Sequence, residues 1–245
     1  MCIDCGCTQP HDHNHDHDHG PHDDAKTISI EQNLLAKNDM LAAGNRERFS
    51  EANMLVLNLV SSPGSGKTTL LEKTLSDLKG EFSFAVLEGD QQTANDADRI
   101  AATGAPVHQI NTGAGCHLDA HMVGHGVEHF DLGQTDILMI ENVGNLVCPA
   151  SFDLGEDLKV AVLSTTEGED KPAKYPHMFR AAEVMIINKT DLLPHLDFDI
   201  EKCRRYALAV NPDLTIFELS CRSGEGLDAW YAWLAKQVGT KKKVI

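Results

Sequence analysis

The sequence of 245 residues has no apolar run that approaches the roughly 20 residues needed to cross a membrane. Its first residues, MCIDCGC, lack the basic and apolar regions of a secretory signal peptide. We therefore expect a cytoplasmic protein without a membrane span. The seven cysteines, in a chain without export signals, indicate thiols or metal ligands rather than a disulfide framework.

Positive charge is also scarce. The chain has 21 Lys and Arg against 37 Asp and Glu, a formal net charge of −16. Six of the acidic residues lie in residues 1–24, which contain no Lys or Arg, so the remainder still has 31 acidic against 21 basic residues. This balance argues against a surface that binds nucleic acid.

Residues 1–24 have almost no apolar side chains and cannot bury a core. Six His between His11 and His22 alternate mainly with Asp, and imidazoles of this kind bind nickel, zinc or copper. A purification tag is the alternative. Tags are usually uninterrupted His, so a native metal-collecting tail is favoured over residues 1–24.

Three cysteines precede the His tract, at Cys2, Cys5 and Cys7. Gly6 allows Cys5 and Cys7 to turn onto one ion, and the amine of the chain lies close enough to be a fourth ligand. A set of N and S donors suits square-planar nickel. The cluster therefore predicts a nickel site in the tail.

Residues 25–53 are expected to form a helical segment that leads into the first strand and packs against the sheet. Ser29 is a plausible N-cap and Gly44 an interruption. The apolar residues at helical spacing are Ile30, Leu34, Leu35, Met40 and Leu41.

Residues 54–240 alternate strand and helix patterns, which predicts an α/β fold with a mostly parallel sheet flanked by helices. Apolar runs predict strands at 54–60, 82–87, 107–110, 136–140, 160–165, 184–187 and 216–219. The segment TEGEDKPAKYP is expected to be a polar loop, and Leu227–Val238 an amphipathic helix that closes the fold.

The stretch NLVSSPGSGKTTLL, Asn58 to Leu71, predicts a P-loop between the first strand and a helix. Free N–H groups at the helix start hold phosphate oxygens, Lys67 reaches the outer phosphates and Thr68 ligates magnesium. Ser61 stands where the first Gly of the pattern belongs, which questions the entry geometry of the loop. The expected nucleotide-binding residues here are Gly64, Ser65, Gly66, Lys67, Thr68 and Thr69.

Two acidic segments follow predicted strands at the carboxyl edge of the sheet, where open α/β sheets bind ligands. Glu88 and Asp90 follow the second strand, and Asp90 is a candidate for magnesium binding or water positioning. Glu141 stands where nucleotide-hydrolysing P-loop proteins carry a second acidic magnesium residue, and Gly144 where a Gly senses the γ-phosphate. We expect Lys67, Asp90 and Glu141 to be catalytic.

Two turns that follow predicted strands carry cysteines. Cys148 comes seven residues after Glu141, so a movement at Glu141 to Gly144 would also move this thiolate; a buried structural Cys is the alternative. The segment NTGAGCHLDAHM places Cys116 and His117 at a strand-to-helix turn, a possible metal half-site. The later His121, His125 and His129 are expected on one helical face, as a packed or solvated stripe; metal ligation is the alternative.

The motif NKTD, Asn188 to Asp191, predicts recognition of guanine. A carboxylate at Asp191 accepts two hydrogen bonds from the guanine edge, Lys189 packs over the ring and Asn188 ties the loop to the P-loop. Sites that demand such hydrogen bonds reject analogues by about 10⁴-fold, so GTP is selected over ATP. The backbone at Ser220 and Cys221 is expected to cap the base.

The segments SSPGSGKTT, EGDQQ, GAGCHLDAHM, IENVGNLVCP and NKTD, together with MCIDCGC and the His tract, resemble the HypB family of hydrogenase nickel-incorporation GTPases over essentially the whole chain. The resemblance implies a P-loop fold, GTP hydrolysis with Mg²⁺, a homodimer on GTP or metal binding, and nickel delivery to the [NiFe]-hydrogenase large-subunit precursor with a HypA-type partner.

The same resemblance implies a tight nickel site at Cys2, Cys5 and Cys7 and a nucleotide-responsive Ni²⁺ or Zn²⁺ site at Cys116, His117 and Cys148. The Cys-Pro-His of urease-type relatives and the Cys-x-Cys-Cys of zinc-chaperone relatives are absent. A passive nickel or zinc storage protein would not explain NKTD. A small-molecule P-loop kinase would not explain the N-terminal cysteines.

Overall fold

Seven parallel strands form one sheet in the computed structural model, which describes residues 22–90, 95–113 and 115–242. The strand order is β3-β2-β4-β1-β5-β6-β7, so the central strand β1 is flanked by β4 and β5. The expected α/β fold with a parallel sheet is confirmed. The strands are β1 Leu55–Ser61, β2 Phe84–Asp90, β3 Val107–Asn111, β4 Ile137–Gly144, β5 Leu158–Ser164, β6 Val184–Asn188 and β7 Thr215–Glu218.

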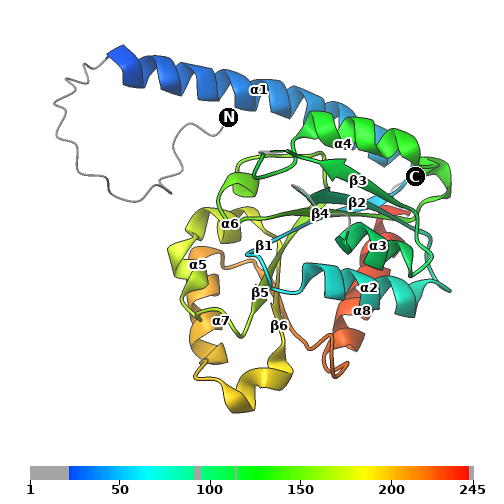
Figure 1. Ribbon diagram of the computed structural model, residues 1–245, viewed down its shortest axis with the longest axis vertical. Coiled ribbons are helices and arrows are strands. Elements are labelled where there is room, and N and C mark those ends of the chain that lie inside the picture. The colour runs from blue at the N-terminus through cyan, green and yellow to red at the C-terminus, as the bar shows by residue number, and fades with distance from the viewer. Residues whose placement is uncertain (1–21, 91–94, 114, 243–245) are drawn as a thin grey trace.

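Helices cover both faces of the sheet (Figure 1). Helices α2, α3 and α8 pack on one face, and α4, α6 and α7 on the other, with α1 lying against α4. The helices are α1 His22–Glu51, α2 Lys67–Leu78, α3 Asn95–Ala101, α4 Ala120–Gly126, α5 Lys171–Lys174, α6 Pro176–Ala181, α7 Ile200–Val210 and α8 Leu227–Lys241. Short 3₁₀ helices are η1 Val127–His129, η2 Leu132–Gln134, η3 Cys148–Ala150 and η4 Thr190–His195.

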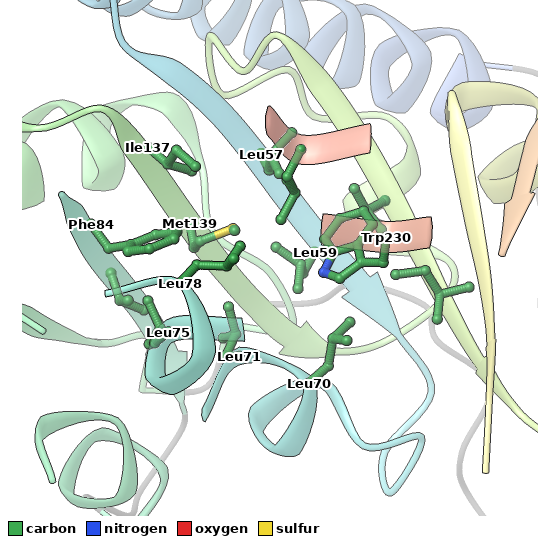
Figure 2. Packing of buried hydrophobic residues seen from close by; sticks show 14 of the residues in the cluster. Leu57, Leu59, Leu70, Leu71, Leu75, Leu78, Phe84, Ile137, Met139 and Trp230 are labelled. Atoms are coloured by element: carbon green, nitrogen blue, oxygen red, sulfur yellow. The ribbon is translucent and has the colours of Figure 1, made fainter. Parts of the chain in front are cut away.

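The core beneath α2 positions the phosphate-binding turn. Strand β1 is buried along its whole length, as expected for a central parallel strand covered on both faces. Its side chains alternate between the faces, and Leu57 and Leu59 meet the leucines of α2 and Trp230 of α8 (Figure 2). Each fully buried side chain of this kind contributes about 1.5–3 kcal/mol, so the strand and helix on either side of the turn are firmly fixed.

Helix α1 differs from the sequence expectation in three ways. It begins at His22, so Ser29 is not its N-cap, and it continues through Gly44 without interruption. Its apolar stripe does not face the domain, because Leu34 and Met40 are 59% and 78% exposed. The buried side chains between residues 33 and 51 are instead Asn38, Ala42, Asn45 and Phe49.

Two amides attach α1 to the domain. Asn45 donates to the carbonyls of Ala120 and Leu154 at 2.8 and 3.0 Å. Asn38 donates to the carbonyl of Asp153 at 2.8 Å and accepts from the N–H of Ala120 at 2.9 Å. The helix therefore packs through specific hydrogen bonds, which a search for apolar periodicity does not detect.

Two further expectations were wrong. Helix α4 ends at Gly126, so His129 leaves the face that carries His121 and His125, and its ring stacks on His108 at 3.8 Å between centroids. The expected polar loop after β5 contains α5, and α6 follows at Pro176. Among the described residues, no helix combines the length and apolar character required to cross a membrane.

Candidate nucleotide and metal sites

The turn between β1 and α2 has the backbone geometry of a phosphate-binding loop. Gly64 and Gly66 adopt φ angles of 75° and 96°, a region that favours glycine. At Gly66 a Cβ atom would lie 2.5 Å from the side-chain nitrogen of Asn188, so a larger residue is excluded here. Gly66 is followed at once by α2, whose first N–H groups are free to bind an anion.

Lys67 is held at the mouth of this turn. Its ammonium is almost fully buried and donates to Ser61 Oγ at 2.8 Å, while Ser61 donates to the carbonyl of Ser62 at 2.7 Å. Burial lowers the pKa of Lys67, and the carboxylate of Glu141 opposes that shift. The serine that replaces the usual first Gly therefore serves as a partner of Lys67.

Three groups beside the turn fit a magnesium ion. Thr68 Oγ1 donates to Glu141 Oε1 at 2.8 Å, and Glu88 lies on the neighbouring strand, level with Glu141. Oε2 of both glutamates is buried without a hydrogen-bond partner among the described residues. Burial raises the pKa of Glu141 and, with repulsion from Glu141, that of Glu88 to about 8. A divalent cation would satisfy these oxygens and offset the clustering of negative charge.

A pocket of about 410 Å³ opens over the turn and contains most of the expected phosphate-binding residues. Among the described residues, Asp96 and Arg99 of α3 line this pocket, whereas Asp90 does not. Arg99 donates to Thr69 Oγ1 at 3.1 Å. Neither Asp96 nor Arg99 was predicted as a site residue, although both are charged residues that follow EGDQQ closely in the sequence. The lining residues are Pro63, Gly64, Ser65, Gly66, Lys67, Thr68, Thr69, Asp96, Arg99, Glu141 and Lys189.

The NKTD segment lies at the end of β6 and contacts the phosphate-binding turn. Asn188 donates to the carbonyl of Ser65 at 3.1 Å, and Lys189 Nζ donates to the carbonyl of Gly64 at 2.7 Å. Lys189 adopts the left-handed conformation, with φ of 64°. Asn188 thus ties this segment to the phosphate-binding turn, and Lys189 lines both adjoining pockets.

A smaller pocket of about 220 Å³ adjoins the first and shares Gly66, Thr69 and Lys189 with it. Asp191, Ser220 and Cys221 also line it. Ser220 Oγ donates to Asp191 Oδ1 at 2.6 Å, which orients the carboxylate toward the pocket edge. The lining of the two joined pockets suits a nucleotide, with phosphate-binding residues in the larger pocket and the carboxylate of Asp191 in the smaller one.

Cys116, His117 and Cys148 come together where the segments that follow β3 and β4 meet. The thiol of Cys116 donates to Cys148 Sγ at 2.8 Å, and Cys116 Sγ lies 3.5 Å from His117 Nδ1. Among the described residues, these form the group of three Cys, His or acidic residues whose ligand atoms all lie within 4.8 Å of one another. Two thiolates and an imidazole are donors for nickel or zinc.

The local structure holds these three side chains partly buried. Asp119 caps α4, so Cys116 and His117 precede the helix rather than open it, and Cys148 begins η3. The His117 ring packs on Phe152 with centroids 3.9 Å apart, and burial lowers the pKa of His117, which favours the neutral imidazole that binds metals. The cysteines of the predicted tail, Cys2, Cys5 and Cys7, lie outside the described residues.

The sheet order, the glycine turn and the two joined pockets define a P-loop nucleotide-binding protein, which also carries a thiol-rich group of metal-ligand type. A family model described as CobW/HypB/UreG, nucleotide-binding domain, matches residues 55–218. The hydrogenase maturation factor HypB of Azotobacter vinelandii is 61% identical over 217 residues, covering 89% of this chain and 72% of that protein. The chain therefore belongs to the HypB family of hydrogenase maturation factors.

Solved structures agree with this assignment. The hydrogenase maturation factor HypB from Archaeoglobus fulgidus superposes with a TM-score of 0.78 at 38% identity, covering 83% of this chain and 99% of that one. HypB from Helicobacter pylori, solved in complex with nickel, gives a TM-score of 0.80 at 41% identity, covering 83% and 96%.

Proposed function

We propose that this protein is a GTP-hydrolysing nickel metallochaperone that delivers nickel to the [NiFe]-hydrogenase large-subunit precursor, with a HypA-type chaperone as partner. Family membership supports the maturation role. The nickel complex of the Helicobacter pylori relative supports nickel as the cargo. The paired pockets and the NKTD segment support GTP as the nucleotide.

One observation carries the link between nucleotide and metal: both sites depend on strand β4 and the segment that follows it. Glu141 accepts the hydroxyl of Thr68 at 2.8 Å on the nucleotide side. Seven residues further along, Cys148 contacts Cys116. A change at Glu141 on exchange of GTP for GDP would therefore be transmitted to a metal ligand.

In the hydrolysis step, Lys67 would neutralise the outer phosphates, and Asp90 would position the attacking water. Thr68, Glu88 and Glu141 would hold Mg²⁺, which supplies charge neutralisation on the phosphates when bound. Asp191 would select guanine. Each assignment follows from the residue's position around the joined pockets or at the strand edge beside them.

At the thiol group, Cys116, His117 and Cys148 would bind Ni²⁺ or Zn²⁺, but three ligands leave the coordination shell incomplete. The same residues of a second copy would complete it and produce a symmetric homodimer. Cys2, Cys5 and Cys7 would form a separate, tighter nickel site in the tail. Metal and GTP would each promote the dimer.

The test is a nickel titration of the full chain carrying Cys2→Ala, Cys5→Ala and Cys7→Ala, here named the tail variant. In this variant the thiolate-to-nickel charge-transfer absorption reports the remaining thiols and not the His tract. We expect a non-hydrolysable GTP analogue and GDP to give nickel affinities that differ by about 5–150-fold. By reciprocity, nickel changes the ratio of the two nucleotide affinities by the same factor.

Two controls define the result. Adding Cys148→Ala to the tail variant should remove the nucleotide effect while nucleotide binding remains, because Cys148 lies outside both nucleotide pockets. Sedimentation in the same buffers measures the dimer fraction. Equal nickel affinities with the analogue, with GDP and without nucleotide would refute the coupling.

A further inference from the structure

A row of buried polar side chains crosses the middle of the sheet, on the face covered by α4, α6 and α7. Asn142 on β4, Asn58 on β1 and Lys159 on β5 are 2%, 0% and 6% exposed. Asn142 donates to Asn58 Oδ1 at 3.2 Å, and Asn58 donates to Glu156 Oε1 at 3.0 Å. Lys159 Nζ lies 3.6 Å from the same glutamate oxygen. We call Asn142, Asn58, Glu156 and Lys159 the polar row.

One end of the polar row holds the first thiol segment. The side-chain oxygen of Asn142 accepts the N–H of Leu118 at 3.1 Å and its neighbour Val143's N–H at 3.0 Å. Leu118 directly follows His117 in the chain. The segment with Cys116 and His117 is therefore attached to β4 by a buried hydrogen bond.

The other end holds the second thiol segment. Lys159 Nζ donates to the carbonyls of Pro149 and Phe152 at 2.9 and 3.3 Å. Pro149 directly follows Cys148, and the ring of Phe152 packs on His117. The two segments whose sulfurs approach to 2.8 Å are thus fixed by opposite ends of one continuous set of buried contacts.

The polar row also begins next to a residue of the nucleotide pocket. Asn142 is the next residue after Glu141, which accepts the hydroxyl of Thr68. A displacement of Glu141 therefore displaces Asn142. Separating the row from its neighbours would leave buried polar atoms unpaired, so its members move together with the backbone that they hold.

We infer that the polar row is the connection through which nucleotide state sets the distance between Cys116 and Cys148, and that Asn142 and Lys159 are positioning residues for the thiol group. The inference builds on the proposed function and names how its two sites communicate. It assigns a role to a buried ion pair and two buried amides that the parallel sheet does not itself require.

The test uses the rate of disulfide formation, in the absence of nickel, to report how readily the two thiols approach each other. In the tail variant, diamide closes the Cys116–Cys148 disulfide by taking up two electrons and two protons from the two thiols, and peptide mass spectrometry follows its formation. Closure is timed with the non-hydrolysable GTP analogue and with GDP. The variants are Asn142→Ala and Lys159→Met, each added to the tail variant.

Asn211→Ala is the matched control. Asn211 also donates two hydrogen bonds to backbone carbonyls, those of Phe179 and Ala182, but contacts neither thiol segment. Thermal melting followed by circular dichroism checks that each chain is folded. Asn142→Ser, which keeps a small polar side chain, replaces Asn142→Ala if the latter does not fold.

In the tail variant and in the Asn211→Ala control, we expect the two nucleotides to give closure rates that differ at least about fivefold, the lower end of real couplings. In the Asn142 and Lys159 variants the ratio should fall to within about twofold of one. A ratio that stays at the parent value in both variants, or a parent ratio of one, would overturn the inference. If nickel affinity is the same with both nucleotides, while the rate of disulfide closure differs between them and this difference is lost in the Asn142 variant, the proposed function fails and the inference stands.

Discussion

The guanine-binding carboxylate permits the sharpest test of nucleotide choice. Asp191 lines the smaller pocket, and the Ser220 hydroxyl occupies one of its lone pairs at 2.6 Å. A carboxylate has about four acceptor positions, so it can still receive both N–H donors of guanine. Asp191→Asn replaces one oxygen with an NH₂ group, which turns a favourable contact with guanine into a meeting of two donors.

The size of the effect follows from those two contacts. Hydrogen bonds to a charged group contribute about 1.5–3 kcal/mol each, so losing both costs about 3–6 kcal/mol, or on the order of 10²- to 10⁴-fold in GTP affinity. Xanthosine triphosphate should gain affinity, because xanthine presents a carbonyl where guanine presents an amino group. The unaltered protein should prefer GTP over ATP by a similar factor.

The assay is isothermal titration with GTP, ATP and xanthosine triphosphate in the presence of Mg²⁺. Asp197→Asn is the control, since it removes the same charge from an exposed carboxylate just after η4. Equal affinity of the unaltered protein for GTP and ATP, or GTP affinity within about threefold of the parent in Asp191→Asn, would refute the reasoning.

Two further predictions concern buried ionisable groups. Glu88 has a pKa of about 8 in the folded chain and of 4.5 in the unfolded chain, so between these pH values only the folded chain keeps the proton. The free energy of unfolding therefore falls as pH rises through this range, by up to about 1.4 kcal/mol per pH unit. In urea unfolding with EDTA, the Glu88→Gln variant should lose this contribution to the difference in free energy of unfolding between pH 5.5 and 7.5. The same difference in the variant and in the unaltered protein would contradict the prediction. Burial raises the pKa of Cys203 to about 12, so its thiolate fraction at pH 8 is on the order of 10⁻⁴. Iodoacetamide should therefore label Cys148 at least about 100-fold faster than Cys203 by mass spectrometry, and comparable rates would count against the assignment of Cys203 to the core.

The nucleotide pocket could be predicted from the sequence because its chemistry restricts residue type. Gly66 must be glycine, since both its φ angle and the closeness of Asn188 exclude a side chain. Lys189 and Asp191 follow the short apolar strand β6, and the parallel topology brings the carboxyl ends of the strands to one edge of the sheet. The strands themselves were predicted within a few residues, because buried parallel strands are continuously apolar.

The thiol group was predicted only in part. Cys116 and His117 are adjacent in sequence, but nothing local shows that Cys148 meets them; that contact depends on where the segments after β3 and β4 cross. The attachment of α1 was missed for a related reason. Asn38 and Asn45 are polar, and their burial depends on partners more than 70 residues away.

The polar row also has a consequence for how the chain folds. A slip of two residues between neighbouring parallel strands keeps every side chain on its own face, so apolar strands alone discriminate weakly against it. In the native register Asn58 lies level with Lys159. A slipped β1 would bring Val56 or Val60 to that level and separate Asn58 from Asn142 and Glu156. Each buried polar group left unpaired in this way costs about 1–3 kcal/mol. The row thus selects one register of the three central strands, before any nucleotide or metal is bound.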